Sequence, residues 1–281
     1  MNQPPPHARR SEPLPEPSVI PSNGWHCGHY FYRFRREALQ GTLASEYQQQ
    51  FRDALNASGD GAPERLVSYW VSGHRADFCV MLMDPDPAKV DGVHQQIMAA
   101  GLGQYVEPEW SFVSMSEVSE YVPTIDRFRE RLIAGGADPD SPELSAKVAA
   151  YERRLPMMNE QRLRPEIPEW PAACFYPMNK SRVVGANWFS EPFSARNSMM
   201  AEHAQSGIAF AGKVSQLISV GVGLDDWEWM VTLWGRNPEY LKEIVYKMRF
   251  DQASAKYAEF GPFYVGYRAG ADEILEHCRL A

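Results

Sequence analysis

Residues 214–234 have the sequence VSQLISVGVGLDDWEWMVTLW, in which two runs of β-branched, aliphatic and aromatic side chains flank a short polar segment. Such side chains favour strands, whereas the glycines and aspartates between them favour a turn. We therefore predict strands over 214–220 and 227–234, paired around a turn at 221–226. This hairpin lies at the centre of a longer pattern of strands and helices.

One strand and one helix flank the hairpin on each side. The helix that follows it has Asn237 as its cap and Pro238 at its first position, and its apolar residues share one face. The predicted elements are a strand at 174–178, a helix at 196–205, the hairpin, a helix with Leu241, Ile244, Val245 and Met248 on its apolar face, and a strand at 263–267. Strand, helix, hairpin, helix, strand is the plan of a ferredoxin-like unit.

The first half of the chain repeats this plan. Its predicted elements are a strand at 25–34, a helix at 45–55 with Tyr47, Phe51 and Leu55 at helical spacing, strands at 66–71 and 78–83, a helix at 87–99 and a strand at 110–118. The predicted fold class is α+β, with two tandem ferredoxin-like units forming a dimeric α+β barrel-type subunit.

The predicted organisation has four parts. Residues 1–22 are proline-rich and polar, and are interpreted as a disordered tail. An N-terminal unit covers 23–122 and a C-terminal unit, which carries the unusual residues described below, covers 172–281. The charged, proline-bearing segment 123–171 is interpreted as a connector with one helix near 142–154.

Composition narrows the class of protein. The net charge of −8 argues against a nucleic-acid partner, because there is no excess of cations to neutralise phosphates. No apolar run approaches the length of a membrane span, and the N-terminus lacks the core of a signal peptide. The four cysteines are scattered without pairing motifs, as is typical of reduced thiols. We therefore expect a cytoplasmic protein.

The segment His26-Cys27-Gly28-His29 resembles a metal-binding clip. It lies in a predicted strand, however, where adjacent side chains point to opposite faces. A metal site here is therefore disfavoured.

Gln216 is the first of several unusual residues, because it shares its strand face with Val214, Ile218 and Val220. Burying an unsatisfied amide costs roughly 1–3 kcal/mol, so a partner is expected. The partner is either a neighbouring strand or buried water, or it is a ligand.

Three further residues allow two interpretations each. His203 follows Met199 and Met200 on a predicted helix, which suits either a core histidine or an axial ligand of a planar cofactor. Arg249 ends a helix, where it serves either the helix dipole or a carboxylate. Tyr176, before Pro177, is either a strand aromatic or a redox-active phenol.

Together these residues belong to segments that resemble the coproheme decarboxylases, a branch of the chlorite dismutase-like superfamily. The resemblance runs from Trp25 to Tyr267 and is densest from Phe175 onward. Its segments are Tyr176-Pro177-Met178-Asn179-Lys180, Ala211-Gly212-Lys213-Val214-Ser215-Gln216, Asp225-Asp226-Trp227-Glu228-Trp229, Met248-Arg249-Phe250-Asp251 and Phe260-Gly261-Pro262-Phe263-Tyr264-Val265-Gly266.

The resemblance implies an enzyme that binds iron coproporphyrin III (coproheme) in its C-terminal unit. Hydrogen peroxide would convert two propionates to vinyl groups in sequence, giving haem b and carbon dioxide. The implied partners are coproheme, peroxide, four further copies in a homopentamer and, in a transient contact, the coproporphyrin ferrochelatase. The implied roles are iron ligation for His203, radical formation for Tyr176, assistance at the second propionate for Lys180, contact with a reactive propionate for Met178, and carboxylate binding for Arg162, Arg249 and Ser254.

This chain also departs from its relatives. Chlorite dismutases have an arginine at the position of Gln216, so the resemblance favours a distal-pocket role for Gln216 and disfavours chlorite chemistry. Several relatives carry a propionate-binding arginine where this chain has Ile208. No histidine occurs between His94 and His203, so the base that activates peroxide is not identified. The alternatives are a non-catalytic haem or coproheme carrier, a chlorite dismutase, and a purely structural module.

Overall fold

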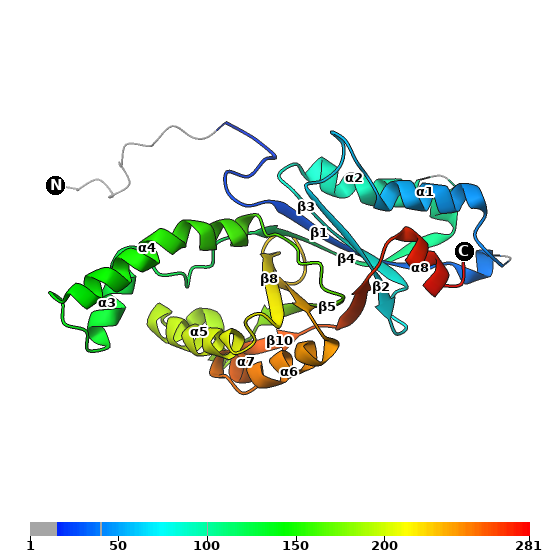
Figure 1. Cartoon of the computed structure of the whole chain (residues 1–281). Helices are drawn as coiled ribbons and strands as arrows, with labels where there is room; N and C mark the ends of the chain where they lie inside the picture. Colours follow the sequence, from blue (N-terminus) through cyan, green and yellow to red (C-terminus); the bar gives the residue numbers. More distant parts are fainter. Residues whose placement is uncertain (1–15, 40, 100) are drawn as a thin grey trace, which may run out of the picture.

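The computed structural model describes residues 16–39, 41–99 and 101–281. Residues 1–15 of the predicted tail lie outside these ranges, and residues 16–22 contain no helix or strand. The N-terminal unit comprises β1 (His26–Phe34), α1 (Ser45–Leu55), β2 (Arg65–Ser72), β3 (Phe78–Asp84), α2 (Pro87–Met98) and β4 (Val106–Ser116), with short 3-10 helices at Arg36–Ala38 and Leu102–Gln104 (Figure 1).

The C-terminal unit follows the same plan. Its main elements are β5 (Ala172–Lys180), α5 (Phe193–Ile208), β8 (Val214–Val220), β9 (Trp229–Gly235), α6 (Pro238–Met248) and β11 (Tyr264–Arg268). Between them lie the small hairpin β6 (Arg182–Val183) and β7 (Ala186–Asn187), the 3-10 helix Trp188–Ser190, α7 (Gln252–Tyr257) and β10 (Ala258–Phe260), and α8 (Ala271–His277) follows β11.

The strands of both units form one closed antiparallel ring. Within each unit the fourth strand lies beside the first, then come the third and the second, in the orders β4-β1-β3-β2 and β11-β5-β9-β8. The units join where β4 pairs with β8 and where β11 pairs with β2. The pairing of β5 with β9 completes the ring. The predicted α+β class is therefore confirmed.

Hydrophobic side chains fill the ring and both layers outside it. The interior holds Phe31, Tyr69, Phe175 and Trp234, which are almost completely buried. The helices α1 and α2 cover the N-terminal strands, and α6 covers β5 and β9. Most strands therefore have one face inside the ring and one face toward helices, as the alternation of side chains requires, whereas the outer face of β4 is exposed at Ser111 and Val113.

Helix α8 packs against the N-terminal unit although it follows the C-terminal unit in the sequence. Ile274, Leu275 and Leu280 are buried in the same cluster as Phe51 of α1. The amide of Leu43 donates to the carbonyl of Leu280 over 2.9 Å. Residues 271–280 thus complete the first hydrophobic core.

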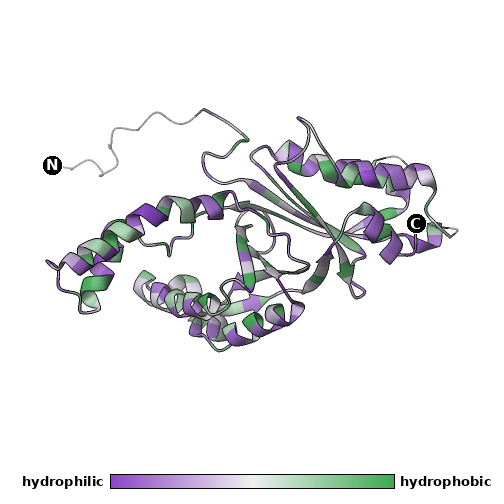
Figure 2. Ribbon diagram, in the orientation of Figure 1, coloured by the Kyte–Doolittle hydropathy of each residue, from purple (hydrophilic) through white to green (hydrophobic). Residues whose placement is uncertain are grey.

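The segment interpreted as a connector contains more helix than predicted. The helix α3 (Ile125–Ala134) was missed, and α4 (Pro142–Leu163) extends well beyond 154. Thr124 and Ser141 cap these helices through their hydroxyl groups. The two helices form an arm that extends away from the ring (Figure 1), and polar and apolar residues alternate along α4 (Figure 2). Charged residues dominate 125–134, so the short apolar stripe of α3 was not recognised in the sequence.

Strand β4 also begins earlier than predicted. Glu107 and Pro108 pair with Arg33 and Tyr32 of β1, and Glu109 is the extra residue at the irregularity between Phe31 and Tyr32. Across the described ranges, no helix is both long and apolar enough to cross a bilayer. All four cysteines are buried and free.

His29 and Thr232 connect the two units inside the ring. His29 Nε2 lies 3.0 Å from Thr232 Oγ1, and the histidine is 1% exposed. His26, in contrast, lies on the other face of β1 and contacts the carbonyl of Val19. Burial lowers the pKa of His29 to about 3, so this ring is neutral in the folded protein.

Acid should therefore weaken the fold through His29. The unfolded chain binds a proton near pH 6.5 and the folded chain only near pH 3, so stability present above pH 6.5 is lost as the pH falls. The free energy of unfolding, from urea titrations, should drop by up to ~1.4 kcal/mol per pH unit between pH 6.5 and 5.

The variant His29→Gln should flatten this slope, whereas His74→Gln, at an exposed loop position, should retain it. Equal slopes in the two variants would show that His29 is not the group responsible.

Candidate functional site

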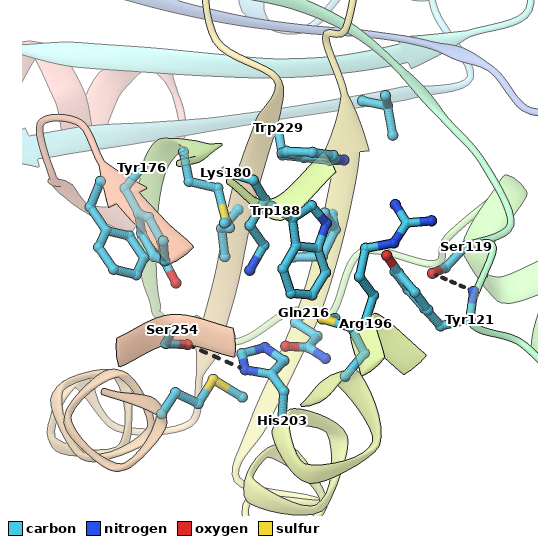
Figure 3. Close-up of a pocket in the computed structure, with 18 of the residues that line it drawn as sticks. Ser119, Tyr121, Tyr176, Lys180, Trp188, Arg196, His203, Gln216, Trp229 and Ser254 are labelled. Carbon is cyan, nitrogen blue, oxygen red and sulfur yellow. Dashed lines mark hydrogen bonds between the residues drawn. The ribbon is translucent and has the colours of Figure 1, made fainter. Parts of the chain in front are cut away.

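A large cavity lies on the helix-facing side of β5, β8 and β9, and α5, α6 and α7 contribute to its other walls (Figure 3). It contains about 1260 Å³ of space free of protein atoms, part of it open to solvent. Its walls are mostly apolar, with a few polar side chains among them. This combination is typical of a site for an organic ligand or cofactor.

Strand β5 supplies three of the predicted residues. Tyr176, Met178 and Lys180 alternate along it and therefore face the cavity together, while Phe175 faces the ring interior. The Tyr176 ring stacks on Phe263 with centroids 4.4 Å apart. Burial raises the pKa of Tyr176, and the nearby Cys174 adds to the rise, so its phenol stays protonated.

Lys180 is a cation held in a nearly closed environment. Its Nζ donates to the carbonyl of Ala253 over 3.0 Å and lies 4.5 Å from the ring centroid of Trp188. Burial lowers the pKa of Lys180 to about 8, although the charges of Asp251 and Glu228 oppose the shift. The lysine therefore remains mostly protonated near pH 7, and a carboxylate that enters the cavity should raise its pKa again.

Glu228 fixes the end of β5 from which Lys180 projects. This carboxylate is 5% exposed and accepts from the backbone amide of Lys180 over 2.8 Å. The backbone amide of Glu228 in turn donates to Asn179, and Arg182 of β6 forms an ion pair with the carboxylate. The β6–β7 hairpin is thereby tied to the cavity wall.

His203 projects from α5 into the cavity and is oriented by Asp251. Its Nδ1 lies 2.9 Å from Asp251 Oδ2, and the Asp251 side chain is 1% exposed. Burial alone would raise the pKa of Asp251, but bonds to His203 and to the backbone amide of Ser254 together lower it. With Nδ1 engaged, Nε2 is the ring nitrogen available to a metal, the arrangement usual for ligating histidines.

Gln216 lies on the cavity side of β8. Together with Ile218 and Val220 it lines the cavity and is exposed, while Leu217 and Ser219 face the ring interior. Of the two interpretations left open by the sequence, the structure does not show a core amide, and the resemblance favours the position on the cavity wall. The apolar face of β8 is a cavity wall, which the periodicity could not distinguish from a core face.

Arg249 and Ser254 also line the cavity. The Arg249 guanidinium lies 4.1 Å from the ring centroid of Phe260, and no acidic side chain in the described ranges pairs with it. Arg162 does not line this cavity. It lies on α4, half-buried, and its Nη1 has no partner within the described part of the chain.

Several cavity residues were not predicted from the sequence. They are Glu117, Ser119, Glu120 and Tyr121 from the segment after β4, Trp188 and Phe189, Arg196 of α5, and Trp229 of β9. The spacing of Arg196, Met200 and His203 at i, i+4 and i+7 places all three on one helix face. This spacing was the one local signal for Arg196, and no local pattern pointed to Tyr121.

Solved structures with the same fold include two informative examples. A novel haem-binding protein from Thermus thermophilus is 29% identical, with a TM-score of 0.72 over 92% of this chain and 95% of the other. A variant of chlorite dismutase from Candidatus Nitrospira defluvii is 17% identical, with a TM-score of 0.68 over 93% of this chain and 98% of the other.

Curated relatives and a family model extend the comparison. A presumed haem-binding protein from Natronomonas pharaonis is 34% identical over 86% of this chain and 36% of its own length, and one from Haloarcula marismortui is 33% identical over 80% and 31%. The chain thus spans about a third of these relatives. The chlorite dismutase family model matches residues 43–269, so this chain belongs to the chlorite dismutase family.

Proposed function

We propose that this protein is a coproheme decarboxylase that uses hydrogen peroxide. The observation that carries the proposal is the convergence of Tyr176, Lys180 and His203 on one large apolar cavity. A histidine anchored by a carboxylate, a buried phenol and a buried cation are the groups that this chemistry requires. The haem-binding names of the Thermus and haloarchaeal relatives support a porphyrin ligand.

The walls of the cavity suit a flat, mainly apolar substrate that carries carboxylates. His203 would bind the iron of coproheme through Nε2, and Asp251 would keep the imidazole in the required tautomer. Lys180 and Arg249 would bind propionates by charge-assisted hydrogen bonds, with Ser254 as a further donor. Met178 would contact a reactive propionate.

The chemistry balances for each propionate. One propionate, one hydrogen peroxide and one proton give one vinyl group, one carbon dioxide and two water molecules. When bound, the iron porphyrin supplies the oxidising equivalents of peroxide. Tyr176, oxidised by one of these equivalents, would take a hydrogen atom from the β-carbon of the propionate. The second equivalent would accept the remaining electron as the bond to the carboxylate breaks, giving the vinyl group and carbon dioxide.

The position of Tyr176 suits this role. A radical can abstract a hydrogen atom only at short range, and Phe260 and Phe263 hold the ring against β5. Burial disfavours the phenolate, so the residue would cycle between the phenol and the neutral radical.

Gln216 favours this reaction over chlorite dismutation. A neutral amide on the cavity wall lacks the cation that chlorite dismutases use at the corresponding position. We further propose that the enzyme works in the cytoplasm as a homopentamer that receives coproheme from the coproporphyrin ferrochelatase.

Tyr176→Phe should separate binding from reaction. The variant should bind iron coproporphyrin III as the parent does but should form haem b roughly 10²-fold more slowly or worse, because it lacks the phenolic O–H bond. Mass spectrometry after stepwise addition of peroxide measures this. For the parent it should show a three-propionate intermediate, followed by haem b.

Tyr246→Phe, at an exposed site on α6, is the matched control and should react at the parental rate. If the parent binds the porphyrin but loses no mass with peroxide, the protein is a carrier. Oxygen release from chlorite at high turnover would instead identify a chlorite dismutase.

Coproheme binding should also depend on pH through Lys180. The free protein has a Lys180 pKa of about 8, and a bound carboxylate should raise it. Affinity should therefore fall as the pH rises above 8, and binding near pH 9 should take up a proton. Calorimetric titration in two buffers of different ionisation enthalpy measures this uptake.

Lys180→Gln should abolish the proton uptake, and Lys213→Gln, at an exposed lysine, should preserve it. Proton uptake that survives in Lys180→Gln would assign the titration to another group.

A further inference from the structure

The cavity has a second polar end that the proposed reaction does not use. Tyr176 lies to one side of His203, whereas Arg196 and Tyr121 lie to the other (Figure 3). Arg196 projects from the first turn of α5, and Tyr121 belongs to the segment between β4 and α3. Both side chains line the cavity.

Arg196 is held in place but incompletely paired. Its Nη1 forms a long ion pair with Glu120 Oε1, at 3.5 Å, and its guanidinium lies 5.8 Å from the ring centroid of Phe193. Its Nε is buried and has no hydrogen-bond partner within the described residues. Because Glu120 uses Nη1 and Nε is buried, Arg196 would have to release Glu120 and turn before a carboxylate could make a two-point contact with it.

Tyr121 likewise has a buried hydrogen-bond donor. Its hydroxyl group is buried and makes no hydrogen bond of normal geometry within the described part of the chain. Burial and the neighbouring Glu120 carboxylate raise its pKa, and its ring stacks on Phe193 with centroids 5.9 Å apart. Buried donors without acceptors are rare in folded proteins, because each keeps the cost of its lost hydration. Two such donors on one cavity wall indicate that an acceptor from a ligand completes them.

Glu120 is the group that a ligand must displace. Its side chain is 51% exposed, so it can turn to solvent and release Arg196. Glu117 is the other carboxyl group on this wall, and burial, together with the charge of Glu120, raises its pKa. When Glu120 turns away, Arg196 loses the acidic partner that it has among the described residues.

We propose that Arg196 and Tyr121 bind the porphyrin propionates that do not react, and that Glu120 occupies Arg196 in the free protein as a stand-in carboxylate. This inference rests on the proposed function, because it takes a porphyrin with carboxylates at both ends as the ligand. The substrate would exchange one carboxylate for another at Arg196. Lys180 and Arg249 would hold the reacting propionates at the other end.

Substitutions at the two partners of the Arg196–Glu120 ion pair should change the affinity for iron coproporphyrin III in opposite directions. Arg196→Gln should raise the Kd for iron coproporphyrin III about 10- to 100-fold, as expected for the loss of charge-assisted hydrogen bonds. Glu120→Gln should lower the Kd about 2- to 5-fold, since it removes a half-exposed competitor. Titrations followed by the porphyrin absorption band measure both. A purely structural ion pair predicts weaker binding in both variants, and that result would overturn the proposal.

Haem b, which keeps only two propionates, tests which carboxylates are bound. Arg196→Gln should weaken haem b and coproheme binding by similar factors, whereas Lys180→Gln should weaken coproheme binding more. The matched controls are Arg164→Gln and Glu160→Gln, an exposed pair at the C-terminal end of α4, which should change neither Kd. If the parent binds no porphyrin, the proposed function fails. If the parent binds and Arg196→Gln has the parental Kd, only this inference fails.

Discussion

The alternation of side chains along β5 is the constraint on which both the fold and the site depend. This strand pairs with β9 on one side and with β11 and β10 on the other, so it cannot rotate without opening the ring. Its fixed orientation sends Phe175 into the ring and Tyr176 into the cavity. A one-residue slip would exchange these faces, so the core that holds the ring closed also sets the direction of the reactive side chains.

Segments that are distant in the sequence supply the other polar groups of the cavity, and contacts between elements fix the orientation of these groups. The helix face that carries Arg196 and His203 lies against α7, where Asp251 caps the helix and accepts from the imidazole. The Asp251 carboxylate thus caps the N-terminus of α7 and also orients the His203 side chain of α5. Other segments also fix the position of Lys180. Glu228 accepts from its backbone amide, and its ammonium group contacts Trp188 and the carbonyl of Ala253.

Sequence patterns predicted the repeated plan and most of its strands, because alternation and helical spacing are local properties. They missed α3, whose apolar stripe is short. Gln216 shows a deeper limit, since an apolar face looks the same in sequence whether it meets a core or an open cavity. The site residues implied by the resemblance do line the cavity, except Arg162, which lies elsewhere on α4. Tyr121 and Glu120 were missed because their position beside Arg196 depends on how the chain returns after β4, which no local pattern encodes.

The position of α8 affects how the chain acquires its structure during synthesis. The first hydrophobic core is incomplete until residues 271–280 have been made, because Ile274, Leu275 and Leu280 fill it. While the ribosome is still adding the second unit, the first unit exposes the surface that α8 will cover. The first half therefore cannot reach its final state before residues 271–280 leave the exit tunnel, and it should fold together with the second half rather than before it.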